Sequence, residues 1–409
     1  MSHRHPVAED AKSSDRRLRS LLQIPLLFLT VAISAEEPFQ ARLDQFPKAG
    51  SHKYIPGELT MADHVNRMGI LRPDRSDDHN KYHWDLPHHF TMLPYGSIRF
   101  RGAPATLRDI PIGTHLHGRL HIGPKGGYRV PLRKTNYEAQ VKNEPNAYSP
   151  DSQYSHVLLF EDDFSFYQRQ GTTWKILSID NEKQELVAER SNQGTGLNGT
   201  QTFALTAATR IWTGGGAGGQ DDLNPGQQIL FNLTWATIYG PGRLTDIWID
   251  EESRIRAAKQ QIASHYQFER DHGAPALIES VEHLERGAGN VTAQFYAGLG
   301  DRGLADFKFK TYGRLIVVES NLRSHDQGND AKPFRLDEII RLPKPSPGSS
   351  GVQVKIYVPE LLEGVRPGRS IRLKASTWPR GDLPREERIS PFDIRPRFLE
   401  VNINGAPAK

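Results

Sequence analysis

Cysteine is absent from the 409 residues of this chain. Without thiols the protein can form no disulfide, no Cys-ligated zinc finger or iron–sulfur cluster, and no thiol nucleophile. The apolar stretch Leu21–Ala35 is only fifteen residues long and is interrupted by Gln23 and Pro25. A helix needs roughly 20 apolar residues to cross a bilayer, so we expect no transmembrane span in the mature chain.

A strong charge of either sign is also missing. The formal net charge is +4, and residues 1–35 carry five of the 52 basic and three of the 48 acidic residues, which leaves the remainder at +2. This small excess is not the electrostatic footprint of a dedicated nucleic-acid-binding protein. Single-stranded nucleic-acid binding stays an alternative only because residues 366–397 are noticeably basic, and salt-sensitive binding would be its sign.

The N-terminal segment has the three parts of a secretory signal. Arg16, Arg17 and Arg19 precede the apolar stretch Leu21–Ala35, which ends in small residues before two glutamates. This order predicts a signal peptide over residues 1–35, a mature N-terminus at Glu36 and an exported, periplasmic or extracellular protein. Retention of the segment as an anchor is the alternative.

One local pattern occurs three times. Each copy has a tight turn with glycine, at Gly113, Gly226 or Gly368, and then an alternating run of apolar and polar residues. Glycine tolerates positive φ in the turn. The period of two predicts half-buried strands, which a small closed barrel buries without leaving a free edge. The predicted inner faces are Leu116, Gly118, Leu120 and Ile122; Ile229, Phe231, Leu233 and Trp235; and Ile371, Leu373, Ala375 and Thr377.

The repeat resembles the last two strands of small exported bacterial β-barrel domains of unknown function. The whole chain is also similar to uncharacterised exported proteins of planctomycete-type bacteria. The segments that carry this likeness are 82–87, 107–117, 161–167 and 234–252. The resemblance implies small OB-like barrels and brings no activity with it.

The resulting expectation is a mainly β chain of three tandem OB-like barrels with one long connecting helix. An irregular lead-in with a short helix near residues 59–71 is expected over 36–81, and a linker over 134–155. The helix over 251–272 begins after Asp250 and ends at Gly273, with an apolar stripe at Ile255, Ala258, Ile262 and Tyr266. The predicted barrels cover 82–133, 156–250 and 275–378, the last with an insertion near 299–350, and 379–409 is a tail.

Histidine is the compositional anomaly, because seven of the sixteen histidines fall between positions 79 and 121. His115, His117 and His121 share one face of a predicted strand. Two imidazoles at i and i+2 can share a zinc or copper ion, and His83 or His88 could add a further ligand. The opposing interpretation, which we favour from sequence, is a solvated outer barrel face. Arg119 lies on that face, and the other two repeats build it without histidine.

No catalytic set is evident in the sequence. The glycine pattern over 194–199 matches a dinucleotide fingerprint by letter, but a strand rather than a helix is expected after it. Glu161, Asp162 and Asp163 could bind calcium or act as paired carboxylates, although flanking apolar residues suggest a solvated strand edge.

Three functions follow as expectations. The first is an exported non-catalytic protein that binds a cell-envelope partner or has a structural role there. The second is a histidine-based metal-binding protein. The third is an enzyme with an interdomain site that uses Asp85, His88 and the acidic cluster 161–163.

Overall fold

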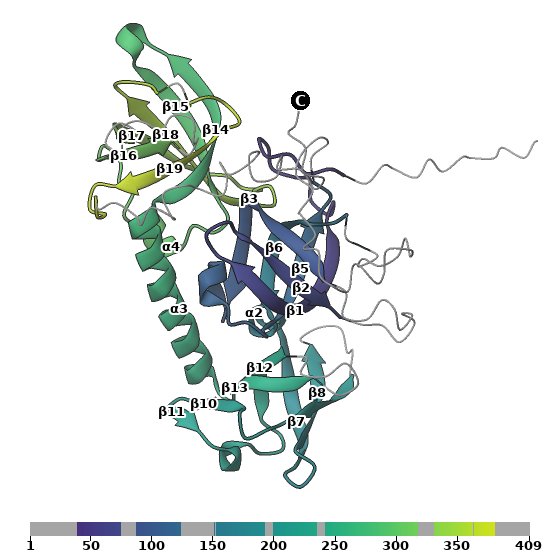
Figure 1. Ribbon diagram of the computed structural model, residues 1–409. Coiled ribbons are helices and arrows are strands. Elements are labelled where there is room, and N and C mark those ends of the chain that lie inside the picture. Colours follow the sequence, from purple (N-terminus) through teal and green to yellow (C-terminus); the bar gives the residue numbers. More distant parts are fainter. Residues whose placement is uncertain are drawn as a thin grey trace, which may run out of the picture. The chain divides into compact units, whose positions relative to one another are not determined.

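The computed structural model describes residues 39–74, 87–123, 151, 153–192, 199–234, 242–317, 331–362 and 364–380. The predicted signal peptide, His83, Asp85 and the glycine pattern before residue 199 lie outside them. Within the described part the chain is mainly β and forms three small closed barrels, as predicted, with one long helix between the second and third (Figure 1). None of the helices among the described residues is long and apolar enough to span a membrane.

Barrel 1 closes five strands in the order β1-β2-β3-β6-β5, and β5 pairs back with β1. β3 and β6 run parallel, whereas the other neighbours are antiparallel. Its core contains Leu59, Phe90, Leu116, Leu120 and Phe160. The bounds are β1 Lys53–Asp63, β2 Met68–Pro73, β3 His88–Phe100, β5 His115–His121 and β6 His156–Asp162, with β4 Ala103–Ala105 beside β3 and η2 Leu107–Asp109 before β5.

Barrel 2 repeats this topology as β7-β8-β9-β13-β12. It again has one parallel pairing, here between β9 and β13. This strand order is that of the OB-fold. Its core contains Trp174, Ile176, Phe203, Phe231 and Leu244. The bounds are α2 Asp163–Arg169, β7 Thr172–Asp180, β8 Glu185–Asn192, β9 Thr200–Ala204, β10 Arg210–Thr213, β11 Gly216–Gly218, η3 Gln220–Asp222, β12 Gln228–Thr234 and β13 Arg243–Trp248.

Barrel 3 has six strands in the order β14-β15-β18-β17-β16-β19, all paired antiparallel. It is therefore a small barrel but does not share the OB-fold order. The expected insertion near 299–350 is wrong, because this region supplies two barrel strands. The bounds are β14 Ala274–His283, η4 Glu285–Gly287, β15 Gly289–Tyr296, α4 Asp301–Leu304, β16 Tyr312–Val317, β17 Ala331–Arg341, β18 Ser349–Val358 and β19 Ser370–Ala375.

The three repeated turns occupy equivalent places. Gly113, Gly226 and Gly368 have φ of 92°, 94° and 79°. In every barrel the glycine N–H donates to a carbonyl on the barrel's first strand, and the same residue of that strand donates back to the residue after the glycine. Each accepting residue lies at a register shift of its strand. These residues are Leu59, Ile176 and Ile278.

The described members of the predicted inner faces are confirmed where they lie on the strands: Leu116, Leu120, Ile229, Phe231 and Ile371 are all fully buried. The expected lead-in is wrong, because the segment around 59–71 forms a β-hairpin instead of a helix. Met61, Val65 and Met68 have the spacing of one helix face, but the segment is extended because β1 pairs with β5 and β2 pairs with β3. Barrel 1 consequently begins at Lys53 and takes β6 from the segment that the sequence assigned to the second barrel.

The helix α3, Glu251–His272, has the predicted bounds. Asp250 caps it by accepting from the Ser253 N–H at 2.7 Å, and Gly273 ends it with a φ of 83°. Its predicted apolar stripe is wrong, because Ile255 and Ile262 are 45% and 39% exposed. The buried face is largely polar instead, and three of its side chains bind distant backbone: Gln261 at Pro104, His265 at Gly298 and Glu269 at Gly300. The buried residues are Ser253, Ala257, Gln261, His265, Glu269 and His272.

Candidate metal centre

The candidate site lies on the outside of β5. His115 and His117 project to the same outer face because they are two residues apart on one strand. β5 pairs with β6, and the chain turns directly from β6 into α2. Asp162 caps that helix by accepting from the Ser165 N–H at 2.9 Å, which places Asp163 in the first turn, over the two histidines.

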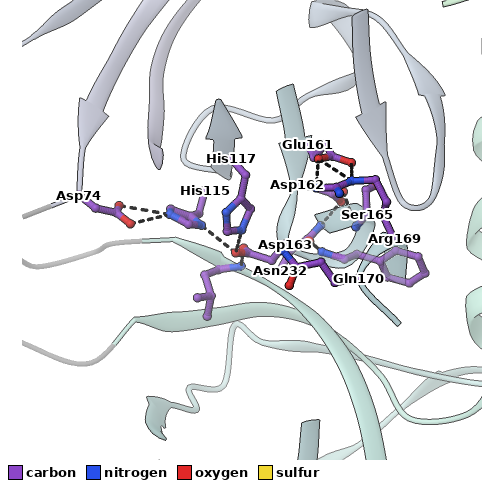
Figure 2. Close-up of polar contacts among 12 residues, drawn as sticks. Asp74, His115, His117, Glu161, Asp162, Asp163, Ser165, Arg169, Gln170 and Asn232 are labelled. Carbon is purple, nitrogen blue, oxygen red and sulfur yellow. Dashed lines mark hydrogen bonds and ion pairs between the residues drawn. The ribbon is translucent and has the colours of Figure 1, made fainter. Parts of the chain in front are cut away.

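Asp163 is the centre of the cluster. Its Oδ1 lies 2.7 Å from His115 Nδ1 and 3.0 Å from His117 Nε2, and its Oδ2 accepts from the Leu233 N–H at 2.9 Å (Figure 2). One nitrogen of each histidine and one Asp163 oxygen all lie within 4.8 Å of one another. Among the described residues this is the one group of at least three such side chains in that arrangement.

The second nitrogen of each histidine is also anchored. His115 Nε2 lies 3.0 Å from Asp74 Oδ2, and His117 Nδ1 lies 2.6 Å from the Tyr54 hydroxyl. The His117 ring stacks on Phe166, with centroids 3.6 Å apart. Both imidazoles are therefore fixed in orientation. Histidine ligands of a metal are usually held in the same way, by a second group that binds the other ring nitrogen.

Barrel 2 covers this face. Besides the contact from Leu233, the Asn232 side chain donates to Asp162 at 2.8 Å and accepts from the Phe164 N–H at 3.0 Å. Thr234 donates to Glu58 at 2.9 Å. The predicted solvated face is consequently wrong: His115 and His117 are 4% and 6% exposed, and Asp163 is fully buried.

The electrostatics follow from this burial. Burial by itself would lower the pKa of His115, but Asp163 and then Asp74 raise it well above its usual value. Burial outweighs the bond to Asp163 and lowers the pKa of His117. Burial would raise the pKa of Asp163, yet His115 and His117 hold it far below its usual range. The centre thus contains a carboxylate, a neutral imidazole and an imidazole paired with two carboxylates.

The arrangement suits a transition metal. In tetrahedral coordination with bonds of about 2.0–2.1 Å, neighbouring ligand atoms lie about 3.3 Å apart. The separations of 2.7 and 3.0 Å from Asp163 Oδ1 would need to widen by roughly 0.6 and 0.3 Å. Two imidazoles and one carboxylate favour zinc or copper over calcium, which takes oxygen ligands.

The structure places the other predicted ligands elsewhere. His121 pairs across the ladder with His156 and is fully buried. His88 Nε2 lies 3.0 Å from the Tyr154 carbonyl. Arg119 lies 4.0 Å from Glu161, whose buried carboxylate also binds Arg169. Arg119, whose charge spoke against a metal site in the sequence, therefore lies beside a carboxylate.

The acidic cluster 161–163 is buried and does not form the expected solvated edge. Sequence reasoning included Asp163 in that cluster but not among the histidine ligands, and it missed Asp74 and Tyr54. A local signal for the start of α2 existed, because Asp is a preferred N-cap residue and Asp162 holds that position. Nothing in the sequence places Asp74 beside His115.

No protein-family model, curated protein or solved structure matches the chain.

Proposed function

We propose that this chain is an exported, non-catalytic protein whose first two barrels meet at a transition-metal site. His115, His117 and Asp163 would be the ligands, and zinc or copper the ion. The observation that carries the proposal is the double anchoring of both imidazoles, one nitrogen toward Asp163 and the other toward Asp74 or Tyr54. Asp74 and Tyr54 would be the supporting groups that orient the ligands.

The role of such an ion would be structural. All three ligands come from barrel 1 and α2, and Asp163 also holds the backbone of β12 in barrel 2. An ion on Asp163 would fix this carboxylate and with it the contact between the two barrels. An ion that binds only the folded protein stabilises it by mass action, by about 2.7 kcal/mol at a free concentration one hundred times Kd.

Titration calorimetry with Zn²⁺ and Cu²⁺ on the metal-free chain from residue 36 tests the site. We expect one ion per chain, and loss of binding in His115→Ala and in His117→Ala. His283→Ala is the matched control because His283 is exposed on β14. Circular dichroism of each variant separates loss of a ligand from loss of folding. Wild-type affinity weaker than roughly millimolar, about −4 kcal/mol, would exclude the metal function.

Export to the cell envelope is the second part of the proposal. It is supported by the charged, apolar and small-residue order of residues 1–35. N-terminal sequencing of the protein from fractionated native cells tests it, with Glu36 as the expected first residue. An intact N-terminus in the cytosolic fraction would contradict export and would leave the metal site unaffected.

A further inference from the structure

A tight turn with an exposed aromatic tip precedes β16 in barrel 3. In this turn, residues 308–311, the Thr311 N–H donates to the Lys308 carbonyl at 3.1 Å, and the Thr311 hydroxyl donates to the same oxygen at 2.6 Å. Phe309 and Lys310 therefore form the tip, and Phe309 is 60% exposed. Tyr312, the first residue of β16, is 64% exposed. Two aromatic side chains three residues apart thus form a local apolar patch in water.

The backbone of the turn is anchored on both sides. Phe307, two residues before the tip, is buried, and its ring packs on Trp378 with centroids 5.3 Å apart. On the other side, the Lys310 N–H donates to the Leu336 carbonyl at 2.8 Å, and the Leu336 N–H donates to the Thr311 carbonyl at 2.9 Å. The apolar tip is therefore a fixed feature of the barrel surface.

The tip also carries positive charge without a counter-charge. Lys308 and Lys310 are exposed, and neither forms an ion pair within the part of the chain that the structure describes. The Lys310 ammonium lies 5.1 Å from the centre of the Phe309 ring. An apolar ring between two unpaired ammonium groups is complementary to a partner that combines an apolar interior with an anionic surface.

The acidic residues around the turn already have partners. The Asp306 carboxylate accepts from the Tyr266 hydroxyl and from the Trp378 indole N–H, both at 2.6 Å. On β17 and β18 opposite charges pair with each other, namely Arg335 with Asp337 and Lys355 with Glu338. The unpaired basic charge is thus confined to the tip and does not continue along the barrel. A single-stranded nucleic acid would need a basic groove that follows its backbone.

We propose that this turn docks barrel 3 onto the surface of an anionic lipid bilayer. Phe309 would insert at the boundary between headgroups and acyl chains, and Tyr312 would lie at the level of the headgroups. Lys308 and Lys310 would pair with the lipid phosphates. Aromatic rings and lysines serve in this way in proteins that lie on a membrane without crossing it. Such docking would give the exported protein of the proposed function a partner in the envelope, although vesicle binding in chelator depends on neither export nor a metal.

Vesicle flotation of the chain from residue 36, with chelator present, tests the proposal. The probes are vesicles of phosphatidylcholine alone and of an equal mixture of phosphatidylcholine and phosphatidylglycerol. We expect the chain to bind the mixed vesicles about tenfold more tightly or better, and added salt should weaken this binding. No binding to the mixed vesicles, or equal binding to both kinds, would overturn the proposal.

Two variants locate the contact. Phe309→Ser and the double variant Lys308→Gln/Lys310→Gln should each weaken binding to the mixed vesicles by about tenfold or more. Ile112→Ser is the matched apolar control, because Ile112 is 59% exposed in barrel 1. Lys175→Gln/Lys259→Gln is the matched charge control, because both lysines are exposed on β7 and α3. Both controls should bind as the wild type does. Equal losses in variants and controls would contradict docking through this turn.

The absence of cysteine allows a direct measurement at the tip. Phe309→Cys supplies a single thiol, on which an apolar, environment-sensitive fluorophore takes the place of the ring; Ile112→Cys is the control. Mixed vesicles should shift the emission to shorter wavelength only at position 309. Vesicle binding without this shift would overturn the proposal. An equal shift with single-stranded DNA instead of vesicles would assign the turn to nucleic acid and would also overturn it.

Discussion

At the scale of single residues, Asp163 joins more partners than its position in the sequence suggests. It is fully buried, and it accepts from two histidines and one backbone N–H. Removing one member of a buried charged pair is costly because the remaining groups stay desolvated without a partner. The same residue is therefore central both to metal binding and to the stability of the metal-free protein.

Asp163→Ala should lower the free energy of unfolding of the metal-free protein by about 3–5 kcal/mol. The alanine removes the acceptor of His115 Nδ1, of His117 Nε2 and of the Leu233 N–H. Urea unfolding with chelator present measures the change. Asp180→Ala is the control, because Asp180 has only exposed partners, the Lys183 ammonium and the N–H groups of Glu182 and Lys183, and its midpoint should move much less. A midpoint for Asp163→Ala equal to that of the control would contradict the account of this cluster.

The buried His156 should make stability fall in acid. Burial first, and His121 second, lower the pKa of His156 to about 4, whereas an unfolded histidine titrates near 6.5. Between pH 6.5 and pH 4 the imidazole of His156 is therefore protonated in the unfolded chain and neutral in the folded chain. This contribution to stability is complete above pH 6.5, and about 3 kcal/mol of it is lost by pH 4.

The matched measurement is the free energy of unfolding of wild type and His156→Phe, both with chelator, between pH 7 and pH 4. We expect the wild type to lose more stability over this range than the variant. His121 also has a pKa lowered to about 4 by burial and by His52, so the variant should retain part of the acid sensitivity. Parallel curves for the two proteins would show that His156 is not buried in its neutral form.

At the scale of elements, the repeated glycine turn was predictable from the sequence. That α2 and β12 cover the outer face of β5 was not predictable. Alternation places Leu116 and Leu120 inside and His115 and His117 outside, because successive side chains on a strand point to opposite faces. It cannot say what lies on the outer face. That depends on α2 and on β12, whose Leu233 is 70 residues away from Asp163.

The long helix shows a related limit. Its capping residue, Asp250, and its terminal glycine, Gly273, are local signals and gave the correct bounds. Its buried face depends on distant carbonyl groups, because Gln261 donates to Pro104 and His265 to Gly298. A search for apolar periodicity selected Ile255 and Ile262, which are exposed.

Gly226→Ala should cost about 1 kcal/mol of stability because alanine is strained at a φ of 94°. A Cβ at this position meets no atom within 4 Å, so the loss reports backbone conformation alone. Gly219→Ala is the matched control, since Gly219 is equally open and has a φ of −119°. Thermal unfolding of the two variants should show a lower Tm only for Gly226→Ala. Equal Tm values would mean that this turn does not require glycine.

At the scale of the whole molecule, barrel 2 is joined to barrel 1 and α2 by polar contacts and by the packing of Phe164 against Leu230 and Trp248, whereas barrels 1 and 3 share an apolar cluster. The polar contacts are those of Asn232, Leu233 and Thr234 with barrel 1 and α2. The apolar cluster contains Leu93, Tyr95 and Leu158 with Leu277 and Tyr296. An ion at the candidate centre should therefore affect barrel 2 more than barrel 3.

Hydrogen exchange with and without Zn²⁺ tests this coupling. The Leu233 amide should exchange more slowly with the ion present, because its acceptor Asp163 would be fixed by the metal. Amides of β14, in barrel 3, serve as the internal reference and should change little. Protection of β14 equal to that of β12 would indicate general stabilisation by binding without a specific link through Asp163.

The bond from Leu233 to Asp163 also sets an order of events during synthesis. All three proposed ligands have left the ribosome once residue 163 has emerged, but the N–H that holds Asp163 follows 70 residues later. At about 5–20 residues per second this interval lasts roughly 4–14 s. During this interval His115, His117 and Asp163 of the nascent chain are not yet covered by β12. Which metal the protein acquires would then depend on the compartment in which those seconds are spent.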